Sequence, residues 1–215
     1  MERLPFYLFF ICAGFFSGSI VYSYFLPKLL LHKNILLLSD DRNPGCANVF
    51  KYIGVPMGIV CLLCDFFKGY LPIMWALHFL EDRSLLFSFV LAAPTAGHML
   101  SPFLHFHGGK AINVSFGCLA ALLPAYGTVW WLVIPFIALS TLFRLNPHSL
   151  RVVASFAILF LLSVFADKNT AVSCGVFLIS ALVTIKHTGV YLHHERSLAK
   201  LQFLNHTLWK RKKKM

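Results

Sequence analysis

Charged residues are scarce in this sequence. Only 13% of its 215 residues are Asp, Glu, Lys or Arg, whereas 58% are hydrophobic and the mean hydropathy is +0.73. A soluble domain usually carries about 25% charged residues, so this scarcity excludes a soluble globular protein. Long apolar runs fill the sequence instead. Because a bilayer crossing takes roughly 20 such residues, they predict an integral membrane protein with no room for a second, soluble domain.

The residues that several other kinds of site require are missing. Cys61 and Cys64 have CxxC spacing, but no second pair or histidine cluster completes a zinc site. Five of the six cysteines lie inside apolar runs, where cysteine acts as a small hydrophobe. The sequence therefore indicates no metal site and no disulfide framework. The full Walker spacing of a P-loop is also absent.

Acidic residues are few, and this sets the charge balance. Eight Asp and Glu stand against 19 Lys and Arg, which gives a formal net charge of +11. The basic residues fall in short loops and in a tail that runs from Lys210 to Lys214. We interpret this tail as a cytoplasmic topology signal that also touches anionic lipid. We expect no nucleic-acid binding, because no folded domain remains to present a basic surface.

Seven apolar segments predict an all-α, polytopic transmembrane bundle of about seven helices. The first run continues too far to be a cleaved signal peptide. Residues 53–80 include Pro72, and we expect this stretch to be broken, tilted or partly re-entrant. The chain divides into a transmembrane domain, 1–190, and a basic cytoplasmic tail, 191–215. The seven segments run over about 5–27, 53–80, 84–104, 111–125, 128–143, 150–166 and 170–187.

The positive-inside rule predicts the orientation of the bundle. Seven crossings put the termini on opposite sides, and most basic residues share a side with the C-terminus. We therefore expect the N-terminus outside and the C-terminus in the cytoplasm. This arrangement brings residues 39–51, residues 105–110 and the His187 region to the cytoplasmic face. The outer side keeps only Arg3, Arg83 and Lys168.

The polar loop at 39–51 carries residues that suit a phosphate. Its Pro44-Gly45 turn lets the backbone approach a ligand, so that N–H groups cradle anionic oxygens. Arginine can grip phosphate with two prongs. The alternative is an ordinary loop between helices. Amide and basic side chains flank the turn: Arg42, Asn43, Asn48 and Lys51.

Two further places put polar groups among apolar residues. Asp65 and Lys68 are three residues apart and share a helix face. They either form a buried ion pair that holds the bundle together, or present the lysine to an anion with Asp65 orienting it. His98 follows Gly97 in an apolar run, where a single histidine is more often a packing residue than a catalyst.

The stretch Gly108-Gly109-Lys110 predicts a second phosphate-binding element. Two glycines leave the backbone bare, and Lys110 opens the next predicted helix. Backbone amides at a helix start, together with an ammonium group, favour phosphate. His187 lies at the last membrane exit and is a further site candidate. The following pair, His193-His194, indicates a solvated amphipathic tail.

Taken in order, these polar and glycine-containing stretches resemble the acyl-phosphate-dependent glycerol-3-phosphate acyltransferases, the PlsY-type family of bacterial inner-membrane enzymes. The resemblance covers residues 1–120 well and is weaker afterwards, where Arg144 and Lys186-His187 fit family positions. The matching stretches are Gly18-Ser19-Ile20; Asn43-Pro44-Gly45 with Asn48-Val49; Asp65-Phe66-Phe67-Lys68-Gly69-Tyr70-Leu71-Pro72; and Gly97-His98 followed by Pro102-Phe103-Leu104, Phe106 and Gly108-Gly109-Lys110.

The resemblance implies transfer of a fatty acyl group from acyl-phosphate to the sn-1 hydroxyl of glycerol 3-phosphate. The products are lysophosphatidate and inorganic phosphate, and no coenzyme or metal is needed. It also implies a multi-pass protein of the bacterial plasma membrane, with its active face in the cytoplasm and membrane lipid around it. His187 or His98 is the candidate general base, unless phosphate itself accepts the proton.

The resulting hypothesis divides the site residues into two groups. Those expected to take part in catalysis are Lys110, His187, His98 and Asn48. Those expected to bind substrate are Ser19, Arg42, Asn43, Gly45, Lys51, Asp65, Lys68, Gly69, Gly97, Gly108, Gly109 and Arg144.

The sequence departs from the family pattern at four positions. Asp41 replaces a serine and should repel phosphate unless Arg42 or a cation pairs with it. These changes predict a divergent branch, and two alternatives stay open. One is a lipid- or phosphate-binding membrane protein that lost the chemistry. The other is a small anion transporter, although we find no convincing internal repeat of the kind that transporters often contain. The other departures are Lys51 for an arginine, His107 for a lysine and Val190 for an asparagine.

Overall fold

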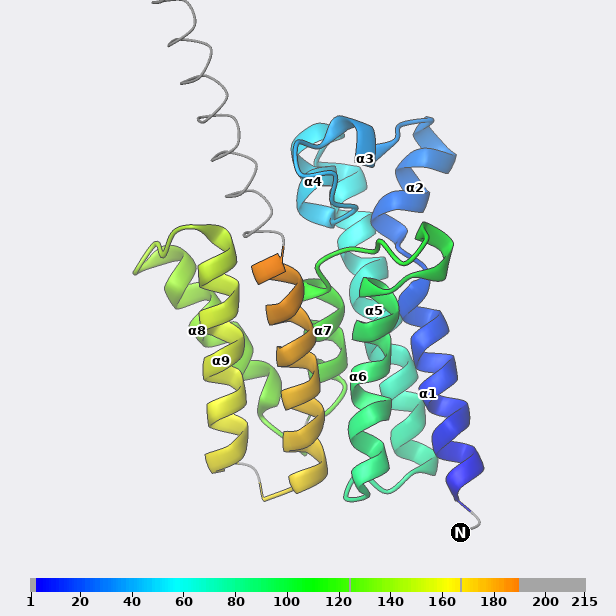
Figure 1. The fold of residues 1–215 in the computed structure, drawn as a ribbon, viewed down its shortest axis with the longest axis vertical. Coiled ribbons are helices and arrows are strands. Elements are labelled where there is room, and N and C mark those ends of the chain that lie inside the picture. Colours follow the sequence, from blue (N-terminus) through cyan, green and yellow to red (C-terminus); the bar gives the residue numbers. More distant parts are fainter. Residues whose placement is uncertain (1–2, 124, 167, 190–215) are drawn as a thin grey trace, which may run out of the picture.

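The computed structural model describes residues 3–123, 125–166 and 168–189, and every regular element in these ranges is a helix (Figure 1). This confirms the all-α prediction. Val190 and the predicted tail at 191–215 lie outside the described residues. In chain order the elements are α1 (Leu4–Ser19), α2 (Tyr22–Leu31), α3 (Ile35–Leu38), α4 (Cys46–Tyr52), α5 (Val55–Phe79), α6 (Leu85–Met99), a 3₁₀ turn (Pro102–Leu104), α7 (Ile112–Ala120), α8 (Thr128–Thr141), α9 (His148–Ala166) and a last helix, Thr170–Gly189.

Helices of membrane-spanning length run through the described part of the chain. Four of them are long and apolar enough to cross a bilayer: α5, the stretch Leu85–Leu104, α9 and Thr170–Gly189. Helices α1 and α2 form a fifth candidate span if they are taken as a bent pair, and α8 is apolar but shorter. Each of the seven predicted apolar segments contains a helix. The protein is therefore a multi-pass membrane protein, and the count of seven crossings stays a prediction.

Of the three alternatives predicted for residues 53–80, the broken helix is wrong, because the break lies in another segment. Within that stretch α5, Val55–Phe79, is one continuous helix, and Pro72 lies inside it without interrupting it. The first segment is broken instead, because α1 and α2 meet at an angle of 45° around Ile20 and Val21. Pro72 has no N–H, so α5 lacks one backbone hydrogen bond there. Membrane helices tolerate this loss because neighbouring groups satisfy the freed carbonyl oxygen.

The buried ion pair of α5 satisfies the backbone that this break exposes. Lys68 Nζ donates to the carbonyl oxygen of Ile20 at 2.7 Å, and the Tyr22 N–H donates to Asp65 Oδ1 at 3.3 Å. Non-helical backbone at membrane depth requires such protein partners, because no water is there to replace them. Asp65 and Lys68, which led us to expect a break within α5, therefore stabilise the break between α1 and α2 instead.

Glycines let the helices of the bundle come into direct backbone contact. A Cβ at Gly97 of α6 would lie 2.0 Å from the carbonyl oxygen of Phe15 in α1, and one at Gly18 would lie 2.0 Å from that of Pro94. Gly69 and Gly117 make the same kind of approach between α5 and α7. Small residues at such crossings are a common means of packing helices within a membrane.

We expect Gly97→Ala to separate α1 from α6 and to lower the thermal stability of the purified protein. The added methyl group meets backbone rather than a movable side chain, so the cost should be at least the 1–3 kcal/mol typical of overpacking. Gly127→Ala is the matched control, because the nearest atom to its Cβ would be 3.9 Å away. Equal melting temperatures for the two variants would contradict the close crossing.

The polar loops at 39–51 and 105–110 lie at one end of the bundle. Figure 1 shows α2, α3 and α4 at the end where α6 connects to α7 and where α8 connects to α9. Helix α1 begins at the opposite end. The convergence of distant loops on one face agrees with the predicted topology, and the assignment of that face to the cytoplasm stays a prediction.

Candidate active site

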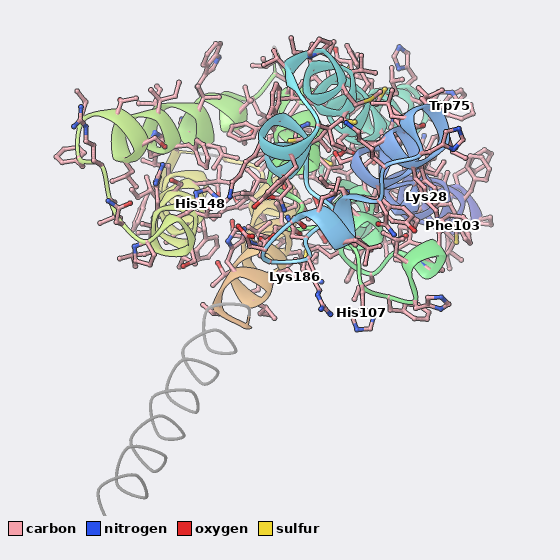
Figure 2. The ribbon with its side chains drawn as sticks, turned by 90° about the horizontal axis from the view of Figure 1, so that it is seen from above. Lys28, Trp75, Phe103, His107, His148 and Lys186 are labelled. Carbon is pink, nitrogen blue, oxygen red and sulfur yellow. The ribbon has the colours of Figure 1, made fainter. Side chains whose placement is uncertain are left out.

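A cavity of about 390 Å³ lies at the polar end of the bundle. Figure 2 looks onto this end and shows His148, which lines the cavity from the start of α9. Charged and amide side chains meet apolar ones in the cavity wall. The polar lining comprises Asp41, Asn43, Asn48, Asp65, His98, Lys110, Asn113 and His148, and the apolar lining includes Leu62, Ile112, Phe116 and Phe136.

Asp41 connects the two predicted phosphate elements. Lys110 Nζ donates to its Oδ2 at 2.8 Å, and the Asn48 side-chain amide donates to its Oδ1 at 2.7 Å. The backbone N–H of Asn43 donates to the same Oδ1 at 3.2 Å. Partial burial acts to raise the pKa of Asp41, but the hydrogen bonds from Lys110 and Asn48 outweigh it and hold that pKa below its usual value. The carboxylate is therefore paired with Lys110 rather than with Arg42.

Both basic residues of the 39–51 loop, Arg42 and Lys51, lie outside the cavity. Lys51 forms an ion pair with Asp40 at 3.1 Å, and both side chains are largely exposed. The Tyr52 hydroxyl donates to Asp40 and, together with Lys51, lowers the pKa of that carboxyl group. Arg42 is exposed in a left-handed backbone conformation, with φ of 48°. These groups form a charged rim beside the cavity.

Lys68, Asp65 and His98 form a buried network at the cavity wall. The side chains of Lys68 and Asp65 are 2% and 3% exposed and lie 2.7 Å apart. Lys68 Nζ also lies 2.7 Å from His98 Nδ1, and Ser23 Oγ donates to Asp65 Oδ2 at 2.5 Å. Because an ammonium only donates, His98 Nδ1 accepts, which assigns the ring proton to Nε2. The three protons of Lys68 are thus directed to Asp65, His98 and Ile20.

Gly108 and Gly109 pack so closely against His98 that no side chain fits at either position. A Cβ at Gly108 would lie 1.9 Å from the carbonyl oxygen of His98, and one at Gly109 would lie 2.3 Å from its Nε2. Their N–H groups donate to the carbonyl oxygens of Met99 and His98, both at 3.1 Å. These amides are therefore engaged within the protein, and Lys110 is the group of this loop that faces the cavity.

His187 is buried beside the cavity rather than in its wall. Its side chain belongs to a residue that is only 1% exposed, and its Nε2 has no hydrogen-bond partner among the described residues. The ring centroid lies 5.9 Å from that of His148, which does line the cavity. Of these two histidines, His148 is thus the one that contacts the cavity.

The structure separates the remaining predicted site residues. Gly45 lines the cavity, whereas Ser19 is fully buried and donates its hydroxyl to Phe15. Gly69 and Gly97 lie at helix crossings, and Arg144 is exposed after α8. Lys51, Lys68 and Lys110 do not share one cavity, and only Lys110 lines the one described here. Lys68 faces a neighbouring groove of about 680 Å³ between α1 and α5, and Lys51 lies outside both spaces.

Three cavity residues with a polar or thiol side chain were not predicted as site residues from the sequence. His148 follows a loop with no motif, so no local signal marks it. Asn113 stands three residues after Lys110, a spacing that places both near one helix start, and it donates to the Leu62 carbonyl oxygen. Cys46 follows Gly45, and burial raises the pKa of its thiol to about 11. Cys46 is therefore a neutral thiol at physiological pH and no nucleophile.

Comparison with known proteins identifies the family of the chain. Residues 8–194 match the family model described as glycerol-3-phosphate acyltransferase. The chain belongs to this family. The glycerol-3-phosphate acyltransferase of Burkholderia vietnamiensis is 31% identical over 153 residues, which cover 69% of each chain. The motifs quoted from the sequence therefore predicted the family correctly.

Other relatives match over shorter stretches. The glycerol-3-phosphate acyltransferase of Aliivibrio salmonicida is 42% identical over 84 residues, or 39% of this chain and 43% of the relative. That of Thermotoga maritima, named glycerol-3-phosphate acyltransferase 1, is 37% identical over 118 residues, or 53% and 56%. The chain thus spans about half the length of these two relatives.

The fold is that of a solved membrane protein. A crystal structure of PlsY, an integral membrane glycerol 3-phosphate acyltransferase, in its glycerol 3-phosphate form superposes with a TM-score of 0.73. The match covers 91% of this chain and 92% of that chain at 23% identity. The lysophosphatidic acid form gives a TM-score of 0.72 at 24% identity. At this identity the similarity establishes the fold.

Proposed function

We propose that this protein transfers a fatty acyl group from acyl-phosphate to the sn-1 hydroxyl of glycerol 3-phosphate. Lysophosphatidate and inorganic phosphate are the products. The reaction takes place on the cytoplasmic side of a bacterial plasma membrane and needs no metal or coenzyme. The family supports the acyl transfer and its acceptor, and the acyl-phosphate donor is part of the proposal.

One observation carries the proposal: a single cavity joins phosphate-binding groups to an apolar wall. Lys110, Asn48 and Asn43 approach it from segments far apart in the chain, and Phe116 and Phe136 line it from the bundle side. Both proposed substrates carry a phosphate, and one carries a long hydrocarbon chain. A site for them needs polar donors at the water edge of an apolar surface.

The donors of this cavity would act on the charges of the reaction. The Lys110 ammonium holds a phosphate oxygen with a charge-assisted hydrogen bond, and the Asn48 amide supplies a second donor. As the acceptor hydroxyl attacks the acyl carbonyl, negative charge develops on the carbonyl oxygen and then on the departing phosphate. Fixed donors that face this charge contribute the largest catalytic effect in many enzymes.

His98 is suited to donate rather than to accept. Lys68 fixes its Nδ1 as an acceptor, so the Nε2–H at the cavity wall is available for a carbonyl or phosphate oxygen. Lys68 and Asp65 are then positioning residues, since their own polar atoms are engaged within the protein. The proton of the attacking hydroxyl passes to the departing phosphate, since Nε2 of His187 has no hydrogen-bond partner among the described residues through which to receive it. Arg42 and Lys51 on the rim attract the anionic substrates.

The direct test is an assay of the purified protein in lipid nanodiscs. Acyl-phosphate and radiolabelled glycerol 3-phosphate should give lysophosphatidate, and acyl-coenzyme A should not replace the acyl-phosphate. A PlsY-type enzyme assayed beside it is the positive control. If that enzyme is active and this protein forms no product at any substrate concentration, the proposed activity is wrong.

A second candidate function is binding of a phosphorylated lipid or metabolite without turnover. The ion pair between Asp41 and Lys110 favours it, because a carboxylate already occupies the main cation of the cavity. In that case the wild-type protein is inactive even at saturating substrate. The combined change Asp41→Ser and Val190→Asn, which restores the family residues, should then create turnover.

A further inference from the structure

The groups proposed to donate hydrogen bonds to a phosphate already donate to the Asp41 carboxylate. One carboxylate oxygen accepts from the Lys110 ammonium, and the other accepts from the Asn48 amide and from the Asn43 N–H. Asn48 is further fixed by donating to the Asn43 carbonyl oxygen at 2.8 Å. An ammonium, a side-chain amide and a backbone N–H together are the donor set that anionic oxygens accept from in proteins.

A phosphate that accepts from the same Lys110, Asn48 and Asn43 groups competes with the Asp41 carboxylate for them. Both are anionic acceptors, and two negative charges at contact distance repel each other strongly in a partly buried site. The pKa of Asp41 lies below its ordinary value, because the bonds from Lys110 and Asn48 outweigh its partial burial. The carboxylate is therefore ionised near neutral pH, and a phosphate has to displace it.

The position of Asp41 allows this displacement. The residue lies in the turn between α3 and α4, outside either helix, and its side chain is 37% exposed. Lys110 is 18% exposed and stands beside the start of α7. The carboxylate can thus rotate toward water without loss of a helical hydrogen bond, while the ammonium stays at the cavity.

We propose that Asp41 is an intramolecular competitor for the phosphate of the substrate. It fills the subsite formed by Lys110, Asn48 and the Asn43 N–H, and a phosphomonoester binds there only by displacing it. Asp41 therefore determines specificity, since a dianionic phosphate displaces it more readily than a singly charged carboxylate does. This inference rests on the proposed function in taking the ligand to be a phosphate.

The test measures binding of inorganic phosphate by calorimetry, with the full chain in nanodiscs. Asp41→Asn removes the charge at constant shape, and Asp41→Ser removes the whole carboxylate. Each variant should bind phosphate about tenfold more tightly than the wild type, a change of about 1.4 kcal/mol. Asp40→Asn is the matched control, because it removes the same charge from the same turn but frees Lys51 instead of Lys110. It should change the affinity less than about twofold.

Two results with the variants would overturn the inference. Unchanged or weaker phosphate binding in both Asp41 variants would mean that the carboxylate supports the site instead of competing for it. An equal gain in Asp40→Asn would mean that only overall charge matters. A measurement on the wild type does not depend on the variants folding. Saturating phosphate should increase carbodiimide labelling of Asp41 relative to Asp40, and no increase would contradict displacement.

The outcome is separable from that of the proposed function. If the Asp41 variants gain phosphate affinity while neither they nor the wild type transfer acyl groups, the competitor inference holds and the enzymatic proposal fails. If the wild type is active and the Asp41 variants show no gain in affinity, the enzymatic proposal holds and the inference fails.

Discussion

Replacing Lys110 with methionine should lower the rate of acyl transfer at least about a hundredfold, the effect typical of removing one donor that faces developing charge. Among the described residues that line the cavity, Lys110 is the sole lysine or arginine. Its loss removes the main attraction for phosphate. It also leaves the Asp41 carboxylate without its cation, so that the cavity becomes repulsive to both substrates.

Lys28→Met is the control for this change. Lys28 is exposed at the end of α2, on the same end of the molecule, and its ammonium donates to the Tyr24 hydroxyl at 2.8 Å. Because it does not line the cavity, its removal should alter the rate less than about twofold. Initial rates should be measured in nanodiscs over a range of both substrates, together with melting temperatures. If Lys110→Met kept the rate of Lys28→Met, the reaction would have to take place elsewhere.

Replacing Lys68 with methionine should destabilise the protein by about 3–5 kcal/mol, as expected when one partner of a buried ion pair is removed. The Asp65 carboxylate would remain 3% exposed with no cation beside it. The carbonyl oxygen of Ile20 and Nδ1 of His98 would each lose the same donor. Unfolding should be followed in mild detergent by thermal melting and by denaturant titration.

Two further variants show whether the buried charge is the cause. Lys51→Met breaks an exposed ion pair and should leave the melting temperature nearly unchanged, because water screens that pair. Lys68→Met combined with Asp65→Asn removes both charges and keeps an acceptor for Ser23, so it should regain part of the lost stability. If the double variant is less stable than Lys68→Met alone, the uncompensated carboxylate is not the source of the loss.

The sequence predicted the elements of the fold better than their interruptions. Apolar runs of membrane length are local features, and a helix occupies each of them. The break was misplaced because Pro72 and the charges of α5 were taken to act on their own helix. The backbone at Ile20 and Val21 breaks without a proline, just after Gly18 and Ser19. What makes that break tolerable is the Asp65–Lys68 pair, which approaches it from another helix.

The site was predicted in part for a related reason. Turns and isolated charges identified Asn43, Asn48 and Lys110, which do line one cavity. Lys51 has the same composition signal, yet it is paired on the rim with Asp40. His148 has no such signal, because it enters the cavity through the packing of α9 against the rest of the bundle.

Hydropathy and motif spacing were enough to assign the membrane class, the helical architecture and the family, because both are properties of short stretches of chain. They could not assign the partner of each charge. Asp41 and Lys110 are 69 residues apart and meet only because the helices between them return to the same end of the bundle. Which donors remain open to a substrate is decided by such distances in space, and only the folded chain contains them.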